Sequence, residues 1–456
     1  MRSFIGFGVL PEIPEIWLGF LRSELNVQPA VCELETFRER SQAVREHAAR
    51  NADLCRALIR AAVPGSVQTQ ENIRRLQMPG SVAVVADFQP MLLGGPAFQI
   101  LKCLTAIRSS HELEQLGVSA VPVCWIHEAA APSVPMDSVW LPDSESGLHN
   151  LQLGRSDGTA VAGNEVIHAD QAAALLSQIR EIGQGAFDTE TFEIIRASYV
   201  PGATLSSACA HLVSSLMEEW GMVVLDAAAP GIGQVFNQAA AASRVWMESG
   251  PSWRQLQDIG MPVAACVIGP YEIHAYVRAL QVFETAGLPK PMPWPQCSAT
   301  LLDARSRRIF ERFRLTLDQL YSGEEEVARR IANSTPRAAF EKLARLRSEV
   351  EGQITELRGE RAGGSDWAQA VDACGEKVLY QLRKLQDLCS AAETRKEHAI
   401  RRQLRIVCSS LAPNGRVQER EIGGIQIPLR FSRGGLRSLC EQLDIRKLEH
   451  QLISMD

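Results

Sequence analysis

The chain has 456 residues, enough for two or three structural units. Its 46% hydrophobic and 22% charged residues are typical of a soluble globular protein, and its net charge of −6 gives no electrostatic reason to bind nucleic acid. No uncharged apolar run reaches the roughly 20 residues of a membrane span, and the cysteines and histidines follow no disulfide or metal-ligand spacing. We therefore expect a cytoplasmic protein without a cofactor, a metal site, bound nucleic acid or a membrane anchor.

Short apolar runs alternate with helical patterns as far as about residue 300. The runs are "VAVVAD" from Val82, "AVPVCWI" from Ala120, "GMVVLDA" from Gly221 and "VAACVIG" from Val263. Gly, Pro or Asp bounds each run, and longer amphipathic stretches separate them. This alternation predicts an α/β domain whose strands form a parallel sheet.

Two of the predicted strands lead into a Gly-Pro turn and then a helix. These turns are Gly95-Pro96 and Gly269-Pro270. Because open α/β sheets bind ligands at the carboxyl ends of their strands, two helix ends there could bind a carboxylate or a phosphate together. The alternative is that Gly-Pro is simply a favourable turn before a helix. Neither turn matches a dinucleotide-binding or P-loop motif.

Residues 303–410 have a different texture, with long charged segments that contain almost no Gly or Pro. Apolar residues step by three and four positions at Leu343, Leu346, Val350, Ile354 and Leu357, and again at Val371, Cys374, Val378, Leu382, Leu385 and Cys389. This spacing predicts an antiparallel coiled-coil arm. We thus expect a core over residues 1–302, the arm as an insertion over 303–410, and a segment over 411–456 that returns to the core.

Several segments resemble one known family in order and spacing. The segments are "AVVADFQPMLLGGPAFQILK", "VPVCWIHE", "EEWGMVVLDAAAPGI", "IGPYEIHAY" and "LAPNGRVQER". Together they cover nearly the whole chain and resemble the bacillithiol biosynthesis cysteine-adding enzymes. The resemblance implies a Rossmann-like core with a helical coiled-coil domain, a homodimer formed through that coiled coil, and a cysteine ligase activity that adds L-cysteine to glucosaminyl-malate.

The resemblance also implies which residues bind these substrates. The positions that match the family pattern at the two turns are Gln89, Gly95, Lys102, Gly269 and Glu272. Both substrates carry carboxylates, so amide-rich helix ends and a lysine suit them. For Lys102 a solvated helix face is the alternative, and for Glu272 a favourable interaction with the helix dipole.

The chain departs from the family pattern after Trp125. Residues 129–132 are Ala-Ala-Ala-Pro, where the family has a cluster of acidic residues and histidine. His127 and Glu128 are the nearest groups that could act as acid and base instead, although both could equally be loop residues. Gln296 stands where the family tends to have arginine.

Three classes of function remain open at this stage. The chain is a cysteine ligase, or a catalytically reduced paralogue that binds a metabolite or a partner through its coiled coil, or a purely structural coiled-coil dimer. The retained turns favour substrate binding, whereas the lost cluster bears on catalysis.

Overall fold

A computed structural model describes most of the chain. The described residues are 2–25, 27, 29–34, 37–48, 52–127, 135–143, 147–153, 163–232, 235, 256, 260–286, 289–333, 338–359 and 365–455. Their contacts divide the chain into two units, residues 1–308 with 409–456, and residues 309–408.

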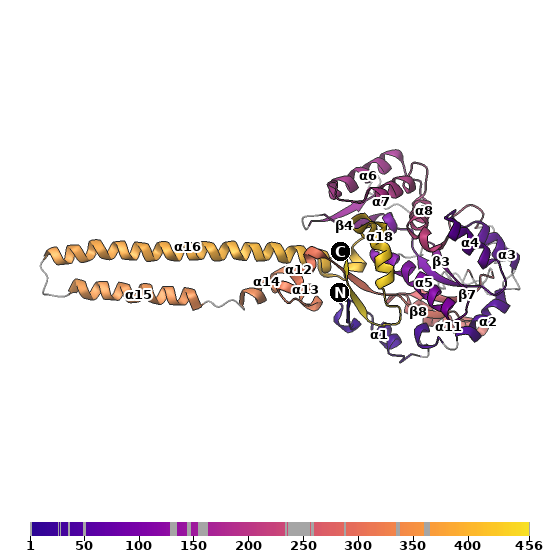
Figure 1. Ribbon diagram of the computed structural model, residues 1–456, viewed down its shortest axis with the longest axis horizontal. Helices are drawn as coiled ribbons and strands as arrows, with labels where there is room; N and C mark the ends of the chain where they lie inside the picture. Colours follow the sequence, from indigo (N-terminus) through magenta and orange to yellow (C-terminus); the bar gives the residue numbers. More distant parts are fainter. Residues whose placement is uncertain are drawn as a thin grey trace. The chain divides into compact units, whose positions relative to one another are not determined.

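A five-stranded parallel sheet forms the centre of the first unit (Figure 1). Its order is β6-β3-β2-β7-β8, and every neighbouring pair is parallel. The strands are β2 (Val82–Phe88), β3 (Ala120–Ile126), β6 (Val223–Asp226), β7 (Val263–Ile268) and β8 (Met292–Pro295). The four apolar runs noted in the sequence are β2, β3, β6 and β7, which confirms the predicted parallel sheet.

Burial on both faces explains why these strands read as continuous apolar runs. Every residue of β3 and β7 is buried, and β2 has only Asp87 partly exposed. Helix α5 (Ala97–Gln115) packs across β2, β3 and β7. The helix is buried over most of its length, including the thiol of Cys103, which lies 3.9 Å from that of Cys124. These two cysteines are core residues, and burial raises the pKa of Cys124 well above its usual value.

Two smaller sheets complete the first unit. In one, β10 (His450–Met455) lies between β1 (Arg2–Ile5), to which it is antiparallel, and β9 (Ala299–Asp303), to which it is parallel. The other is an antiparallel hairpin of β4 (Ser138–Pro142) and β5 (Leu148–Gln152). The surrounding helices are α1 (Glu15–Leu21), α2 (Phe37–Ala48), α3 (Ala52–Arg60), α4 (Val67–Leu76), α6 (Ala169–Gly183), α7 (Thr189–Ser198), α8 (Leu205–Met217) and α11 (Ile273–Ala286).

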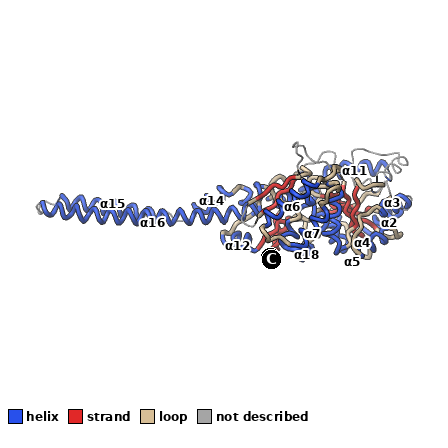
Figure 2. Tube along the Cα trace, turned by 90° about the horizontal axis from the view of Figure 1, so that it is seen from above, coloured by secondary structure: helices blue, strands red, loops and turns tan. Residues whose placement is uncertain are grey.

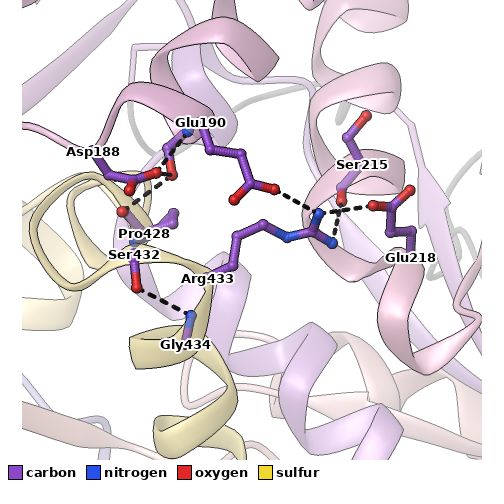
Figure 3. A network of polar contacts seen from close by, with 9 residues as sticks. Asp188, Glu190, Ser215, Glu218, Pro428, Ser432, Arg433 and Gly434 are labelled. Carbon is purple, nitrogen blue, oxygen red and sulfur yellow. Dashed lines mark hydrogen bonds and ion pairs between the residues drawn. The ribbon is translucent and has the colours of Figure 1, made fainter.

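The end of the chain packs into the same unit through α17 (Gln418–Glu421) and α18 (Gln426–Gln442). Figure 3 shows how α18 is held: the guanidinium of Arg433 lies 3.1 Å from the Glu190 carboxylate and 2.8 Å from that of Glu218. Within α18, Ser432 has a φ of 60°, and its hydroxyl accepts a hydrogen bond from the Gly434 amide. The chain therefore restarts the helix at this point.

The second unit is helical and contains the predicted arm. Its helices are α13 (Leu317–Tyr321), α14 (Glu324–Asn333), α15 (Ala338–Gly359) and most of α16 (Ser365–Leu411), while α12 (Ala304–Arg312) crosses the boundary between the units. Figures 1 and 2 show α15 running alongside α16. The ion pair of Arg358 with Asp372 and the hydrogen bond from Arg347 to Gln386 fix an antiparallel register.

The side chains between the two helices of the arm are half-buried rather than fully buried. Leu343, Val350 and Leu382 are among them, as the heptad spacing predicts, whereas Leu385 is 46% exposed. The seam on α16 instead passes through Gly375, where an added Cβ would lie 2.8 Å from the side chain of Ile354. No described helix, α16 included, combines the length and apolar character needed to cross a bilayer.

Candidate functional site

The strand order places one edge of the sheet at a topological switch point. β2 is central, and the chain passes first to β3 and β6 on one side and later to β7 and β8 on the other. In open α/β sheets, the crevice outside the carboxyl ends of the strands at such a reversal is the usual ligand site. Here that position lies where β2 ends at Phe88 and β7 at Ile268.

Lys102 and Glu272 join the two sides of this switch point. The Lys102 ammonium lies 2.7 Å from Glu272 Oε1 and donates a 2.6 Å hydrogen bond to the carbonyl of Asp87. The Lys102 side chain is 1% exposed. Burial lowers its pKa, but Glu272 and Asp87 outweigh that effect, so the pKa of Lys102 is raised. Lys102 is therefore an internal partner of Glu272 rather than the solvated cation that could meet an anion directly.

The backbone amides at the two Gly-Pro turns, expected to bind an anion, form hydrogen bonds within the chain instead. Gly269 donates its amide hydrogen to Glu272 Oε2 at 2.8 Å. At the other turn, the amide of Ala97 donates to the carbonyl of Ile422, and the amide and carbonyl of Gly95 bond Leu92 and Gly424. The expectation of two open, anion-binding helix ends is corrected by these contacts.

The conformation of the first turn nevertheless requires a glycine at position 95. Gly95 has a φ of 70°, and an added Cβ would lie 2.7 Å from Met91 Sδ, so no larger residue fits. Gln89 is half-buried, and its carbonyl accepts a hydrogen bond from the Gln99 amide group at 3.3 Å. In this chain apolar side chains pack around the turn. The polar groups of the site therefore come from other residues.

His127 follows β3 directly and lies beside Asp87. Its Nε2 is 2.9 Å from Asp87 Oδ1, and both side chains are about one-fifth exposed, at 19% and 20%. The backbone amide of His127 also bonds the carbonyl of Phe88, which extends the parallel pairing of β2 and β3. A carboxylate in this position can orient the imidazole and stabilise its protonated form. Glu128 and residues 129–134 lie outside the described residues.

Arg420 contributes a cation to the same place, with Glu419 and Glu272 among its charged neighbours. Its guanidinium lies 4.1 Å from the ring centre of Tyr271 and 4.7 Å from that of Phe98. Within the described part of the chain, no hydrogen bond or ion pair of this guanidinium is found. Stacking between two rings fixes its orientation and leaves its N–H groups for another partner. Burial lowers the pKa of Arg420, although arginine stays protonated at physiological pH.

The residues before Arg420 explain how it is held. Gln418 exchanges hydrogen bonds with the backbone of Leu301 at 2.7 and 2.9 Å, and Glu419 accepts them from Ser298 and from the Ala299 amide. Both side chains are buried, and burial raises the pKa of Glu419 to about 7. α17 is thereby fixed to β9, which positions Arg420.

Sequence reasoning missed Asp87 and Arg420 as members of this site. Asp87 reads as part of an apolar strand, and nothing in the chain order places it beside His127. Arg420 lies in "LAPNGRVQER", a segment quoted only for its resemblance, so the family match was the available signal. Among the described residues, no group of three or more His, Cys, Asp and Glu side chains could hold a metal ion.

Comparison with known proteins gives this site its family context. The sequence model of the N-terminal Rossmann-like domain of bacillithiol biosynthesis BshC matches residues 26–244, and that of the C-terminal coiled-coil domain of BshC matches residues 299–455. The chain belongs to the BshC family. The two matched domains agree with the parallel sheet and the helical arm, which confirms the predicted fold class.

Relatives in the BshC family match the chain over most of its length at low identity. The BshC proteins of Solibacter usitatus and Koribacter versatilis are each 22% identical, over 78% of this chain and 81% of their own. That of Salinibacter ruber is also 22% identical, over 85% of each chain. The resemblance found from sequence motifs is thus confirmed.

Proposed function

We propose that this chain is a cysteine ligase of bacillithiol biosynthesis, which adds L-cysteine to glucosaminyl-malate. Its BshC relatives carry a cysteine ligase name, and they match four-fifths or more of their own length. The observation that carries the proposal is the set of polar groups gathered at the switch point, where Arg420 and the paired Asp87 and His127 lie beside the Lys102–Glu272 pair. A structural coiled-coil protein would need none of them.

These groups suit the chemistry of amide formation. A co-reactant must first make one carboxyl oxygen a leaving group. The amine nitrogen then bonds to the carboxyl carbon, the C–O bond to that leaving group breaks, and the nitrogen loses a proton to a base. We assign this role to His127 Nδ1, because Nε2 faces Asp87 Oδ1, which orients the ring. Glu128 remains a further candidate for the acid. Gln89, Gly95, Lys102, Gly269 and Glu272 shape and support the substrate-binding crevice, with Lys102 acting through Glu272.

The proposal is tested with purified protein and a cell extract. The extract comes from a bacillithiol-producing strain without its cysteine-adding enzyme, so it supplies any activating co-reactant. Adding the chain together with L-cysteine and glucosaminyl-malate is expected to give bacillithiol by mass spectrometry. An extract that yields bacillithiol with a family enzyme as positive control, but none with this chain, would refute the ligase assignment.

We further propose that the protein is a cytoplasmic homodimer formed through the arm. Beside the half-buried seam of α16 lies a row of exposed apolar side chains, shifted by one position along the helix, at Trp367, Val378, Leu385 and Leu388. α15 carries Leu346 and Leu357 in the same way. In an antiparallel hairpin these two rows flank the same side of the seam, so a second copy could cover them.

The dimer is tested by sedimentation. The double variant Leu385→Glu, Leu388→Glu places two charges on the exposed row and is expected to turn a dimer into a monomer at micromolar concentration. Lys384→Glu, which changes a charged neighbour outside the row, serves as the matched control. If the double variant sediments like the unchanged chain, the arm face is not the dimer contact.

A further inference from the structure

Gln296 is a buried polar side chain without a partner. It follows β8 directly, at the same carboxyl edge of the sheet as Gly269 and Glu272, and it is only 4% exposed. Its backbone amide bonds Ile268, but neither Oε1 nor Nε2 of its side chain has a hydrogen-bond partner among the described residues. Leaving a buried amide group unsatisfied costs about 1–3 kcal/mol, so such a group calls for an explanation.

Three side chains of different charge converge above Gly269. An added Cβ at Gly269 would lie 2.8 Å from Gln296 Oε1, 3.6 Å from Glu272 Oε2 and 3.9 Å from Arg420 Nη2. The φ of Gly269 is not in the left-handed region, so its backbone does not require glycine. Glycine instead lets a neutral amide, a carboxylate and a guanidinium approach one another here, because even a Cβ would be too close to Gln296 Oε1.

The chemistry of these groups selects a ligand that carries both charges. Arg420 and the Gln296 amide nitrogen are donors suited to a carboxylate, whereas Glu272 and the Gln296 amide oxygen are acceptors suited to an ammonium group. A simple carboxylate would be repelled by Glu272, and a simple amine by Arg420. Glu272 already bonds Lys102 and Gly269, but each carboxylate oxygen can accept a second hydrogen bond.

We propose that Gln296, Arg420 and Glu272 form a subsite for the zwitterionic head of an α-amino acid, with Gln296 bonding both its ammonium and its carboxylate. The inference rests on the proposed function, in which the amino acid is L-cysteine. Gln296 is then a specificity-determining residue, because its amide group can donate to the carboxylate and accept from the ammonium.

The subsite is tested by calorimetric titration of the full-length chain, with and without glucosaminyl-malate present. L-Cysteine is expected to bind at least tenfold more tightly than 3-mercaptopropionate, which lacks the ammonium group, and cysteamine, which lacks the carboxylate. L-Malate carries no ammonium group and is expected to be equally weak at this subsite.

Two variants separate this role from a structural one. Gln296→Leu and Arg420→Met are each expected to lower the affinity for L-cysteine at least tenfold. Arg437 is an exposed arginine on α18, and Arg437→Met is expected to leave that affinity unchanged. Gln296→Leu removes an unsatisfied buried amide, so the melting temperature should stay the same or rise. If Gln296 had a purely structural role, its replacement by leucine would lower the melting temperature.

The possible outcomes distinguish the subsite from the ligase assignment. Undetectable L-cysteine binding under both conditions would overturn the subsite, as would equal L-cysteine binding by Gln296→Leu, Arg420→Met and the unchanged chain. Equal binding of L-malate that depends on the same residues would overturn the amino-acid assignment. Amino-acid binding that depends on both residues, without bacillithiol formation in the extract, would leave the subsite standing and refute the ligase.

Discussion

Replacing Lys102 by methionine is expected to lower the free energy of unfolding by about 3 kcal/mol. Removing one member of a buried ion pair typically costs about 3–5 kcal/mol, because the other charge is left uncompensated. The lower end applies here, since the Glu272 side chain is 37% exposed and can be partly rehydrated. The carbonyl of Asp87 also loses the hydrogen bond from Lys102.

Urea unfolding of the full chain measures this effect, with Lys290→Met as the control. Lys290 pairs with Glu284 at the surface, and such exposed pairs contribute only about 0–1 kcal/mol. The double variant Lys102→Met, Glu272→Gln should recover part of the loss, because it removes both charges together. A loss below about 1 kcal/mol in Lys102→Met would contradict the description of Lys102 as a structural partner of Glu272.

Replacing His127 by alanine is expected to lower the ligation rate by about 10²–10⁴-fold, the usual contribution of a positioned general base. The structure supplies a reason for this residue in particular: Asp87 lies 2.9 Å from its ring and can stabilise the imidazolium that forms. Asp87→Asn should therefore slow the reaction too, and the double variant should be no slower than His127→Ala alone.

The readout is initial rate in the extract assay, with His149→Ala as the matched control. His149 also pairs with an aspartate at 2.9 Å, but it lies on the β4–β5 hairpin, and its side chain is 47% exposed. The pH profile of Asp87→Asn should shift relative to the unchanged chain if Asp87 acts through His127. If the His127→Ala variant ligates within about threefold of the rate of the unchanged chain, another residue is the general base.

The sequence predicted the fold well because the decisive signals are local. The first five residues of "VAVVAD" are all apolar, as expected of a strand buried on both faces, and a helix of crossover length, α5, connects this run to the next one. The heptad spacing likewise predicted the helical arm. The position of Leu385 was predicted wrongly. Two rows of apolar side chains, one residue apart, run along α16, and the sequence does not say which row packs against α15.

The candidate site was less predictable because its members come from distant parts of the chain. Lys102 was identified by resemblance, but its partner Glu272 is 170 residues away, and their pairing turned a predicted ligand contact into an internal ion pair. Asp87, Gln296 and Arg420 meet the other residues only through the strand order and the anchoring of α17. No periodicity in the sequence encodes that arrangement.

Complementation tests the ligase assignment most directly. The chain is expressed in a strain that makes glucosaminyl-malate but lacks its cysteine-adding enzyme, and bacillithiol is quantified as a fluorescent thiol derivative. We expect bacillithiol to rise at least tenfold above the empty-vector strain, and His127→Ala at equal protein level to remove most of that rise. Accumulated glucosaminyl-malate without bacillithiol, in cells that contain the folded chain, would contradict the account.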